Sequence, residues 1–495
     1  MGLLVATIFL TFAVAVGVAL IGEKSDKIRN ALLMFICIFD FAVLISKSKA
    51  ILSGQLAPYV LANISDFKIA FQADALSLLM GVMITFLWIL TTLYAIGYMS
   101  SEHGQTRFFT FLTICLGATL GVIFARDLIT FYIFFEILTL AVYPLIIHEG
   151  TADAMRAGSR YLVFLLTGGV LVLAGVVLTY SLTGGNVDFT IGGIPQLAAC
   201  EPGVLYALFA CFVVGFGVKA ALVPLHLWLP RAMVAPTPVS AVLHAVAVVN
   251  VGLYGFIRTV YHVFGPSLFG QMRMDTILAV PAAITIIYAA AVALSAKEIK
   301  KMLAYSTVNQ LSYVILGVSS LHPIALLGAL LHMLYHSIMK IGLFYSAGII
   351  KKETGKSNIK DMAGMGNGVL PITLAAFTVG ALGIIGLPPV AGYLSKWYLI
   401  KGFLHIGHPW IASVFIISSV MEIGYFVPPI LAAYTGGRKG GEGADIQVHR
   451  REGKFEAPLS MLIPLVIVAI LAIAFGFFGS LPFTLGRASV KILIP

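Results

Sequence analysis

Charged side chains are scarce in this sequence. Asp, Glu, Lys and Arg make up 11% of the 495 residues, whereas soluble domains carry about 25%. Hydrophobic residues make up 60%, and the mean hydropathy is +1.00. A water-soluble fold of this length has no place to bury so much apolar surface. The sequence therefore predicts a chain whose main solvent is the lipid bilayer.

Cysteine is also scarce, and its placement argues against two kinds of site. The four cysteines form no CxxC pair, and three of them lie inside apolar runs. This pattern favours neither a disulfide framework nor a metal cluster. No GxGxxG opens a helix after a strand, and no histidine pairs across spans indicate haem. We therefore expect no cofactor, no metal and no redox reaction within this chain.

Long hydrophilic segments are missing, apart from GGRKGGEGADIQVHRREGKFE at residues 436–456. Its glycine and charge content predicts a flexible loop, and it is too short to form a soluble domain. The net charge of +10 raises the question of nucleic acid. The basic residues lie in short gaps between apolar runs, however, with no patch interleaved with aromatics, so no nucleic-acid partner is expected.

What the sequence does contain is a series of apolar runs of membrane-spanning length. About 20 helical residues cross the hydrocarbon core, and these runs are too long and uniform for β-barrel strands. The first run has no basic residues before it, so it is predicted to be a membrane helix and not a cleaved signal peptide. We expect an all-α polytopic membrane protein with about fourteen spans, near residues 1–22, 28–46, 75–99, 107–125, 127–147, 159–183, 203–228, 236–262, 273–295, 301–319, 322–350, 370–400, 408–435 and 457–480.

The gaps between these runs predict an orientation. Most of the 31 Lys and Arg residues fall in alternate gaps, beginning with the gap after the first run. Cytoplasmic loops carry the excess of basic residues, so that side should face the cytoplasm. With an even number of spans, both termini would lie on the extracytoplasmic side of the cell membrane.

Three basic residues remain inside apolar runs: Lys219, Lys340 and Lys396. A charged side chain at the bilayer centre costs roughly 2.5–3.5 kcal/mol or more, so each must face the protein interior and find partners or water. Glu136, near the middle of its run, is the natural partner for Lys219. Prolines close to Lys219 and Lys396 predict broken helices, which expose backbone groups near the midplane. Snorkelling lysines and a purely structural ion pair remain alternatives.

The segment LLHMLYHSIMKIGLFYSAG places His332, His336 and Lys340 at i, i+4 and i+8. This spacing aligns three titratable groups along one helical face. Such a row suits a proton relay, because histidine accepts and releases protons near neutral pH. A zinc site is disfavoured, since no third ligand and no HExxH pattern are present, and histidines satisfied within a core remain an alternative.

Further polar residues within or beside the runs are weaker candidates. A lone intramembrane histidine is often structural, and an acidic residue at the edge of a run is often interfacial. Polar side chains on residues 306–312 either hold water or join helices. The individual candidates are His226, His244, Asn250, Asp74 and Glu422.

Six stretches together resemble the antiporter-like membrane subunits of respiratory complex I, especially the chain 5 type, and the D-type subunit of Mrp sodium/proton antiporters. Similar subunits occur in membrane-bound hydrogenases. The stretches run from about residue 70 to 400 and read FQADALSLLM, ITFYIFFEILTLAVYPLI, GFGVKAALVPLHLWLPRAMVAPTPVSAVLHA, KEIKKMLAYSTVNQLSYVILG, LHMLYHSIMKIGLFYSAG and GALGIIGLPPVAGYLSKWYLI.

The resemblance implies an organisation in four parts. Three helices at 1–100 precede two inverted five-helix repeats at 101–265 and 266–435, which contain the broken helices. A cytoplasmic loop and a last helix occupy 436–495. Complex I chain 5 carries a long lateral helix after its last span, whereas little chain follows the fourteenth run here, which favours the Mrp and hydrogenase branch.

The resemblance also implies roles for the buried residues. Glu136 and Lys219 are expected to act as a coupled pair, and Lys396 as the exit-side lysine. The central proton relay is expected to consist of His244, His332, His336 and Lys340. Many relatives have a lysine where Asn250 stands, so His244 is expected to take over that step here.

The expected function is translocation of protons, or exchange of protons for sodium ions, as a non-redox subunit beside other membrane subunits. The alternative is a secondary transporter of a small solute that acts alone. The parent complex remains open between antiporter, hydrogenase, sulfur reductase and complex I types.

Overall fold

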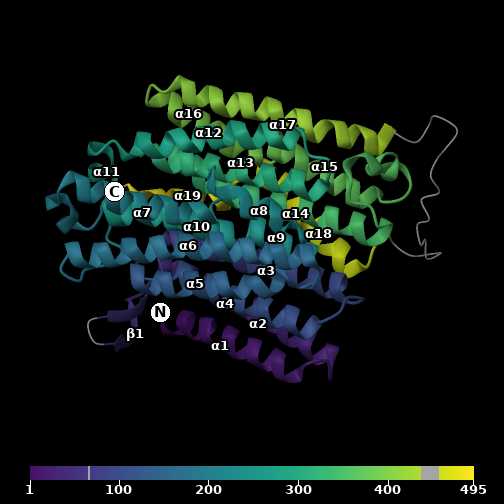
Figure 1. The fold of residues 1–495 in the computed structure, drawn as a ribbon, viewed down its shortest axis with the longest axis horizontal. Coiled ribbons are helices and arrows are strands. Elements are labelled where there is room, and N and C mark those ends of the chain that lie inside the picture. Colours follow the sequence, from purple (N-terminus) through teal and green to yellow (C-terminus); the bar gives the residue numbers. More distant parts are fainter. Residues whose placement is uncertain (65–66, 436–455, 495) are drawn as a thin grey trace.

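Helices account for nearly all of the regular structure. The computed structural model describes residues 1–64, 67–435 and 456–494. The predicted loop at 436–456 therefore lies, except for its last residue, outside the described residues. Figure 1 shows the helices side by side along one direction, as a membrane bundle requires. The prediction of an all-α polytopic membrane protein is confirmed.

The helices vary widely in length, and several are too short to cross a bilayer. In chain order they are α1 (Gly2–Ile21), α2 (Asp26–Leu52), α3 (Ala75–Met99), α4 (Gln105–Ile123), α5 (Leu128–Ile146), α6 (Ala152–Leu182), α7 (Pro202–Lys219), α8 (Trp228–Arg231), α9 (Thr237–Ala245), α10 (Val248–Arg258), α11 (Pro266–Gln271), α12 (Met274–Leu294), α13 (Ile299–Ser319), α14 (Pro323–Thr354), α15 (Pro371–Ile385), α16 (Gly392–His405), α17 (Pro409–Thr435), α18 (Leu459–Phe477) and α19 (Ser480–Leu493).

The remaining elements are short. A two-stranded antiparallel hairpin, β1 (Tyr59–Ile64) with β2 (Phe67–Phe71), is the sheet found in the described residues. A π-helical turn, η4 (Thr259–Phe264), continues α10. Single 3-10 turns are η1 (Pro195–Ala199), η2 (Leu225–Leu227), η3 (Ala232–Val234), η5 (Ile359–Met362) and η6 (Met365–Asn367).

Twelve helical segments in the described part of the chain are long and apolar enough to span a membrane, or thirteen if one bent pair is counted as a span. Two of the predicted runs do not form a single helix that is long and apolar enough to span a membrane. The run at 301–319 is α13, whose polar side chains lower its hydropathy, and the run at 370–400 is divided between α15 and α16. The count of about fourteen stays a prediction.

Helices are interrupted near both predicted break points. α7 ends at Lys219, and only short helical turns follow before α9 begins at Thr237. α15 ends at Ile385, and α16 begins at Gly392. Proline cannot donate the backbone hydrogen bond that continues a helix, so Pro224 and Pro388 account for these interruptions. Backbone carbonyls at both breaks accept side-chain donors instead: Val218 O accepts from Trp228 Nε1 over 2.7 Å, and Ile385 O accepts from Lys396 Nζ over 3.2 Å.

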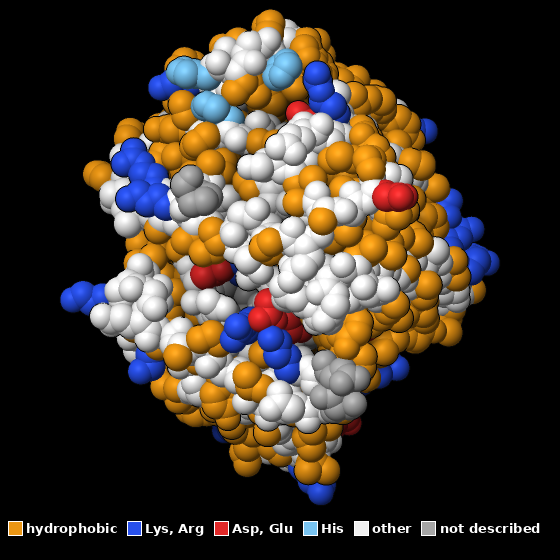
Figure 2. Space-filling model, turned by 90° about the vertical axis from the view of Figure 1, so that its left-hand side faces the viewer, with side chains coloured by type: hydrophobic (Ala, Val, Ile, Leu, Met, Phe, Trp, Pro, Cys, Tyr) orange, Lys and Arg blue, Asp and Glu red, His pale blue; other side chains and the backbone are white. Residues whose placement is uncertain are grey.

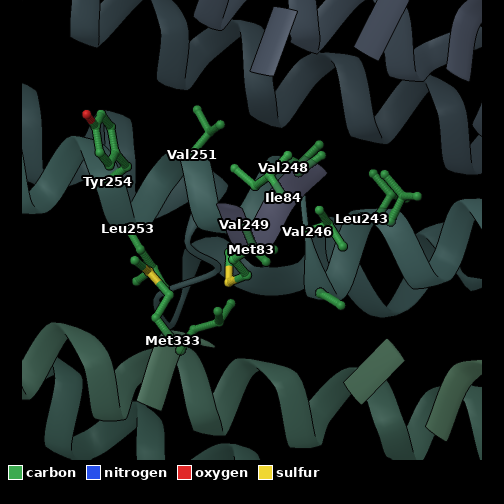
Figure 3. Close-up of a cluster of buried hydrophobic side chains, with 14 of the residues drawn as sticks. Met83, Ile84, Leu243, Val246, Val248, Val249, Val251, Leu253, Tyr254 and Met333 are labelled. Carbon is green, nitrogen blue, oxygen red and sulfur yellow. The ribbon is translucent and has the colours of Figure 1, made fainter. Parts of the chain in front are cut away.

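A third interruption, between α9 and α10, lies in the core. Figure 3 shows apolar side chains from α9, α10 and the link between them, among them Leu243, Val246 and Val249, gathered with Met83 of α3 and Met333 of α14. Every residue from Thr237 to Phe264 is buried. This segment therefore joins the two halves of the chain through the middle of the protein.

Both termini lie at the same end of the bundle, together with the hairpin (Figure 1). Figure 2 looks onto this end and shows small groups of basic and acidic side chains, flanked by hydrophobic side chains that continue onto the sides. A common end for the two termini agrees with an even number of crossings. The side of the membrane on which this end lies stays a prediction.

Candidate functional site

Lys219 is the last residue of α7, and its side chain is 1% exposed. Its ammonium donates a hydrogen bond to the backbone oxygen of Phe135 on α5 over 2.6 Å. The nitrogen also stands 3.2 Å from the centroid of the Phe135 ring. A carbonyl and an aromatic face both attract a cation, so they compensate part of the cost of burying this charge.

Glu136 follows Phe135 directly, yet no ion pair within 4.0 Å joins it to Lys219 in the described structure. The carboxyl instead lies against α6, where a Cβ atom on Gly169 would stand 2.1 Å from its Oε1. That oxygen is buried without a hydrogen-bond partner. Glu136 on α5 and Lys219 on α7 thus lie near each other, as Lys219 contacts the residue next to Glu136. Their charged groups, however, do not form an ion pair in this structure.

The row of titratable groups on α14 is buried as predicted. His332 and His336 are each 1% exposed, and Lys340 is fully buried. The two imidazole rings lie nearly parallel, with centroids 6.3 Å apart. Lys340 donates to Ser306 Oγ of α13 over 2.8 Å. At the other end of the row, His332 Nδ1 lies 3.0 Å from Ser395 Oγ of α16.

Lys396 forms an ion pair that the sequence had not assigned. Its ammonium lies 2.5 Å from Glu422 Oε2 on α17, and it also donates to Ser419 Oγ over 2.9 Å. The other carboxylate oxygen of Glu422 accepts a hydrogen bond from Gln310 Nε2 over 2.6 Å. In the sequence, Glu422 stood only among the weaker candidates. The position of this carboxylate in the middle of an apolar run could have predicted a nearby cation, because a buried charge needs a partner.

Ser395 connects this ion pair to the row on α14, because it precedes Lys396 and contacts His332. Tyr313 stacks on the His332 ring with centroids 5.2 Å apart, and its hydroxyl lies 3.4 Å from Glu422 Oε1. Neither Ser395 nor Tyr313 stood out in the sequence. They connect the row of His332, His336 and Lys340 on α14 to the ion pair of α16 and α17, and together with Lys219 these groups are called the polar line below.

Asn250 lies on α10, beside α14. Its amide nitrogen donates to Ser337 Oγ of α14 over 3.1 Å and to Ala245 O over 2.8 Å. Two residues later, a Cβ atom on Gly252 would lie 2.9 Å from Lys219 Cβ. α10 therefore packs directly between Lys219 and α14, and Asn250 provides a polar group within that contact.

The remaining predicted histidines, His226 and His244, pack against aromatic rings and make no hydrogen bonds to the described residues. His244 is fully buried, and its ring packs 4.8 Å from that of Phe344. His226 packs between the rings of Tyr288 and Tyr305, at 5.4 and 6.0 Å. Neither ring makes a hydrogen bond within the described structure. The structure does not bring His226 into the line of charged groups.

Asp74 caps the first turn of α3 by accepting the backbone N–H of Ser77, and it pairs with Arg258 over 2.7 Å. The prediction of a charge at the edge of a span fits this position. Its partner on α10, distant in sequence, was not foreseen.

Several buried polar atoms on these helices have no hydrogen-bond partner among the residues that the structure describes. They include Glu136 Oε1, His332 Nε2, His336 Nε2, Asn250 Oδ1 and Gln310 Oε1. Buried polar groups are almost always hydrogen-bonded, and internal water satisfies those that the protein does not. Within the described residues, no group of three or more His, Cys, Asp or Glu side chains is arranged to hold a metal ion.

A multi-pass helical membrane protein with buried lysines beside breaks in its helices, and with buried carboxylates and histidines on neighbouring helices, is of the antiporter-like class. Residues 125–422 match the family described as NADH:quinone oxidoreductase/Mrp antiporter, transmembrane region, and residues 61–109 match the complex I chain 5 N-terminus. The chain belongs to this family and is an antiporter-like membrane subunit.

Individual relatives support this family assignment. NADH-quinone oxidoreductase subunit N of Desulforudis audaxviator is 34% identical over 406 residues, which cover 80% of each chain. One Na(+)/H(+) antiporter subunit of Alkalihalophilus pseudofirmus is 31% identical over 85% of this chain, which spans only 54% of that longer relative. A chain of the membrane-bound sulfane sulfur reductase, an archaeal respiratory membrane complex, shares the fold with a TM-score of 0.84 at 23% identity, covering 100% of this chain and 97% of that one.

Proposed function

We propose that this chain carries protons across the cell membrane, or exchanges them for sodium ions, as a subunit of a larger membrane complex. The observation that supports this most is the line of buried titratable groups from Lys219 to the pair of Lys396 and Glu422. Intramembrane ionisable groups that face the protein interior typically mark ion pathways. The two inverted repeats at 101–265 and 266–435 form the framework of this proposal.

In the proposed cycle, Glu136 and Lys219 alternate between close approach and separation. The separated arrangement leaves Lys219 without a carboxylate, so it gives its proton to the row on α14. Moving one charge against 100 mV costs about 2.3 kcal/mol, and breaking a buried pair costs about 3–5 kcal/mol. Separation of the pair is therefore of the right magnitude to drive one proton onward. Lys396 releases it at the far end.

A partner subunit completes the proposal. Glu136 retains partial exposure where α5 and α6 face outward, and lipid is a poor environment for a carboxylate. Another membrane subunit covering this face would shield Glu136 and change its charge balance. The named relatives and the structural neighbour come from respiratory and antiporter systems, which suits a chain that works beside others.

The test is ion flux in proteoliposomes that contain the chain together with its co-purifying subunits. An imposed pH gradient should drive sodium uptake, or an imposed potential should drive proton movement, and the chain alone should carry far less. Absence of both fluxes from the assembled complex would refute the proposal. Full flux of a small solute by the isolated chain would favour a solitary transporter instead.

Gly169 offers a specific test of the separated arrangement. Gly169→Ala places a methyl group where the Glu136 carboxyl now lies, since the Cβ position is 2.1 Å from Oε1. We expect transport to slow about tenfold, which corresponds to about 1.4 kcal/mol on the barrier, because Glu136 loses this position. Initial rates of flux in the reconstituted complex measure the effect.

Gly17→Ala on α1 is the matched control, because a Cβ atom at this helical glycine would meet no packed neighbour within 4 Å. It should assemble normally and keep transport within about twofold. Equal rates for Gly169→Ala and the unmodified complex would show that Glu136 does not need this position.

A further inference from the structure

Two histidines from different segments lie together at the end of the molecule that holds both termini, called the terminus-bearing end below. His322 immediately precedes α14, and His405 is the last residue of α16. Their imidazole rings have centroids 6.2 Å apart, with an angle of 35° between the ring planes. Figure 2 shows histidine side chains close together on this end. Neither residue belongs to the polar line, so the pair has no role in the proposed cycle.

Close packing between α14 and α16 fixes the position of the two histidines. Three residues inward from the pair on each helix, a Cβ atom on Gly402 would lie 2.5 Å from the backbone nitrogen of Ala325. Glycine permits this close approach of two backbones because it has no side chain. Residues three apart lie on the same face of a helix, so the contact also brings His322 and His405 together.

The turn that presents His322 has a defined shape. Leu321, the residue before it, has a φ of 51°, in the left-handed region that residues with a side chain rarely adopt. The backbone N–H of His322 donates to Ser320 Oγ over 3.2 Å. A strained backbone persists only where the surrounding structure determines it. The imidazole of His322 is therefore held beside α16 by the fold and not by a flexible loop.

The ring nitrogens of the pair are suited to binding a metal ion. His405 Nδ1 lies 3.0 Å from the backbone oxygen of Lys401. Because a carbonyl oxygen only accepts, Nδ1 carries the proton and Nε2 keeps a lone pair, as in most metal-binding histidines. His322 Nδ1 is buried and has no hydrogen-bond partner among the described residues. Buried nitrogens almost always have a partner, and a metal ion between the rings would provide one.

The distance between the rings fits two ligands of one ion. Zinc binds an imidazole nitrogen at about 2.0–2.1 Å, so two imidazoles that share one zinc ion have centroids about 5–6.5 Å apart. The observed 6.2 Å lies within this range. Imidazole also suits copper and nickel, whereas calcium and magnesium prefer oxygen ligands. Two protein ligands leave the other coordination positions to water, so the ion is exchangeable, unlike one in a structural site with four protein ligands.

We propose that His322 and His405 bind a divalent transition-metal ion, represented by zinc, and that this ion clips α14 to α16 and slows transport. Further inward along the same two helices, His332 lies 3.0 Å from Ser395, which precedes Lys396. An ion that fixes the ends of both helices restricts their relative movement at this contact. The metal site stands on its own geometry, whereas its effect on transport rests on the proposed function.

Zinc binding to the purified complex tests the site. Isothermal titration calorimetry should show that His322→Gln and His405→Gln each weaken zinc binding about tenfold or more, because each removes one ligand. His408→Gln is the matched control, since His408 is an exposed histidine in the loop after α16. Within the described residues no third His, Cys, Asp or Glu side chain joins the pair. The His408→Gln complex should therefore bind zinc within about twofold of the unmodified affinity.

Ion flux in sealed proteoliposomes of known orientation tests the clip. Zinc added on the terminus-bearing side should slow flux by the unmodified complex about fivefold or more, and it should not slow the His322→Gln and His405→Gln complexes. Unchanged zinc affinity in these two variants, or an equal loss in His408→Gln, would overturn the site. Zinc that binds without slowing flux would overturn the clip. Calorimetry does not require transport, so a complex that binds zinc as expected but carries no ions even without zinc would refute the proposed function alone.

Discussion

Replacing Lys219 with alanine is expected to abolish ion transport by the assembled complex. The rate should fall by about two orders of magnitude or more, because the change removes the proton-carrying group that faces Phe135 at the end of α7. The complex should still assemble, since the substitution removes a buried charge and creates none. Flux in proteoliposomes and the subunit content of the purified complex measure the two effects.

Lys301→Ala provides the control for the loss of a lysine. Lys301 is half-exposed at the start of α13 and pairs over 2.7 Å with Glu298, the residue just before that helix. An exposed pair of this kind contributes little, so transport and assembly should both stay near the unmodified level. Undiminished flux in the Lys219→Ala complex would show that the pathway does not run through this lysine.

Replacing Lys396 with methionine is expected to have the largest effect on stability. It leaves the fully buried Glu422 carboxylate without its cation, and loss of one partner of a buried pair costs about 3–5 kcal/mol. The Lys396→Met complex should therefore unfold at a clearly lower temperature. It should also lose transport, because the last lysine of the line is gone.

The double substitution Lys396→Met with Glu422→Gln separates the two effects. A neutral amide keeps the hydrogen bond to Gln310 and removes the uncompensated charge, so most of the thermal stability should return while transport stays lost. Lys401→Met, at an exposed position on the same helix, is the control and should change neither property. If the single Lys396→Met variant keeps the melting temperature of the unmodified complex, the ammonium of Lys396 does not stabilise the buried carboxylate of Glu422.

The sequence was informative about elements whose signal is local. Runs of apolar residues identified the spans, and prolines identified the breaks after Lys219 and before Lys396, because both depend on the chemistry of adjacent residues. The row of His332, His336 and Lys340 followed from helical spacing alone. The division of 370–400 into two short helices follows from the same prolines.

What escaped the sequence depends on packing between distant segments. Glu422 is 26 residues from Lys396, and Asp74 is 184 residues from Arg258. Spacing along one helix does not indicate which side chains two different helices bring together. The separation of Glu136 from Lys219 is likewise set by the glycine at 169 on a third helix, which no local pattern connects to a carboxylate.

A structure of the assembled complex that resolves ordered water tests most directly whether water connects the buried charges into one polar line. We predict water molecules bonded to the unpartnered nitrogens of His332 and His336, and a hydrogen-bonded chain from Lys219 through α14 to Lys396. Apolar side chains filling the spaces between these residues, with no water between them, would contradict the account.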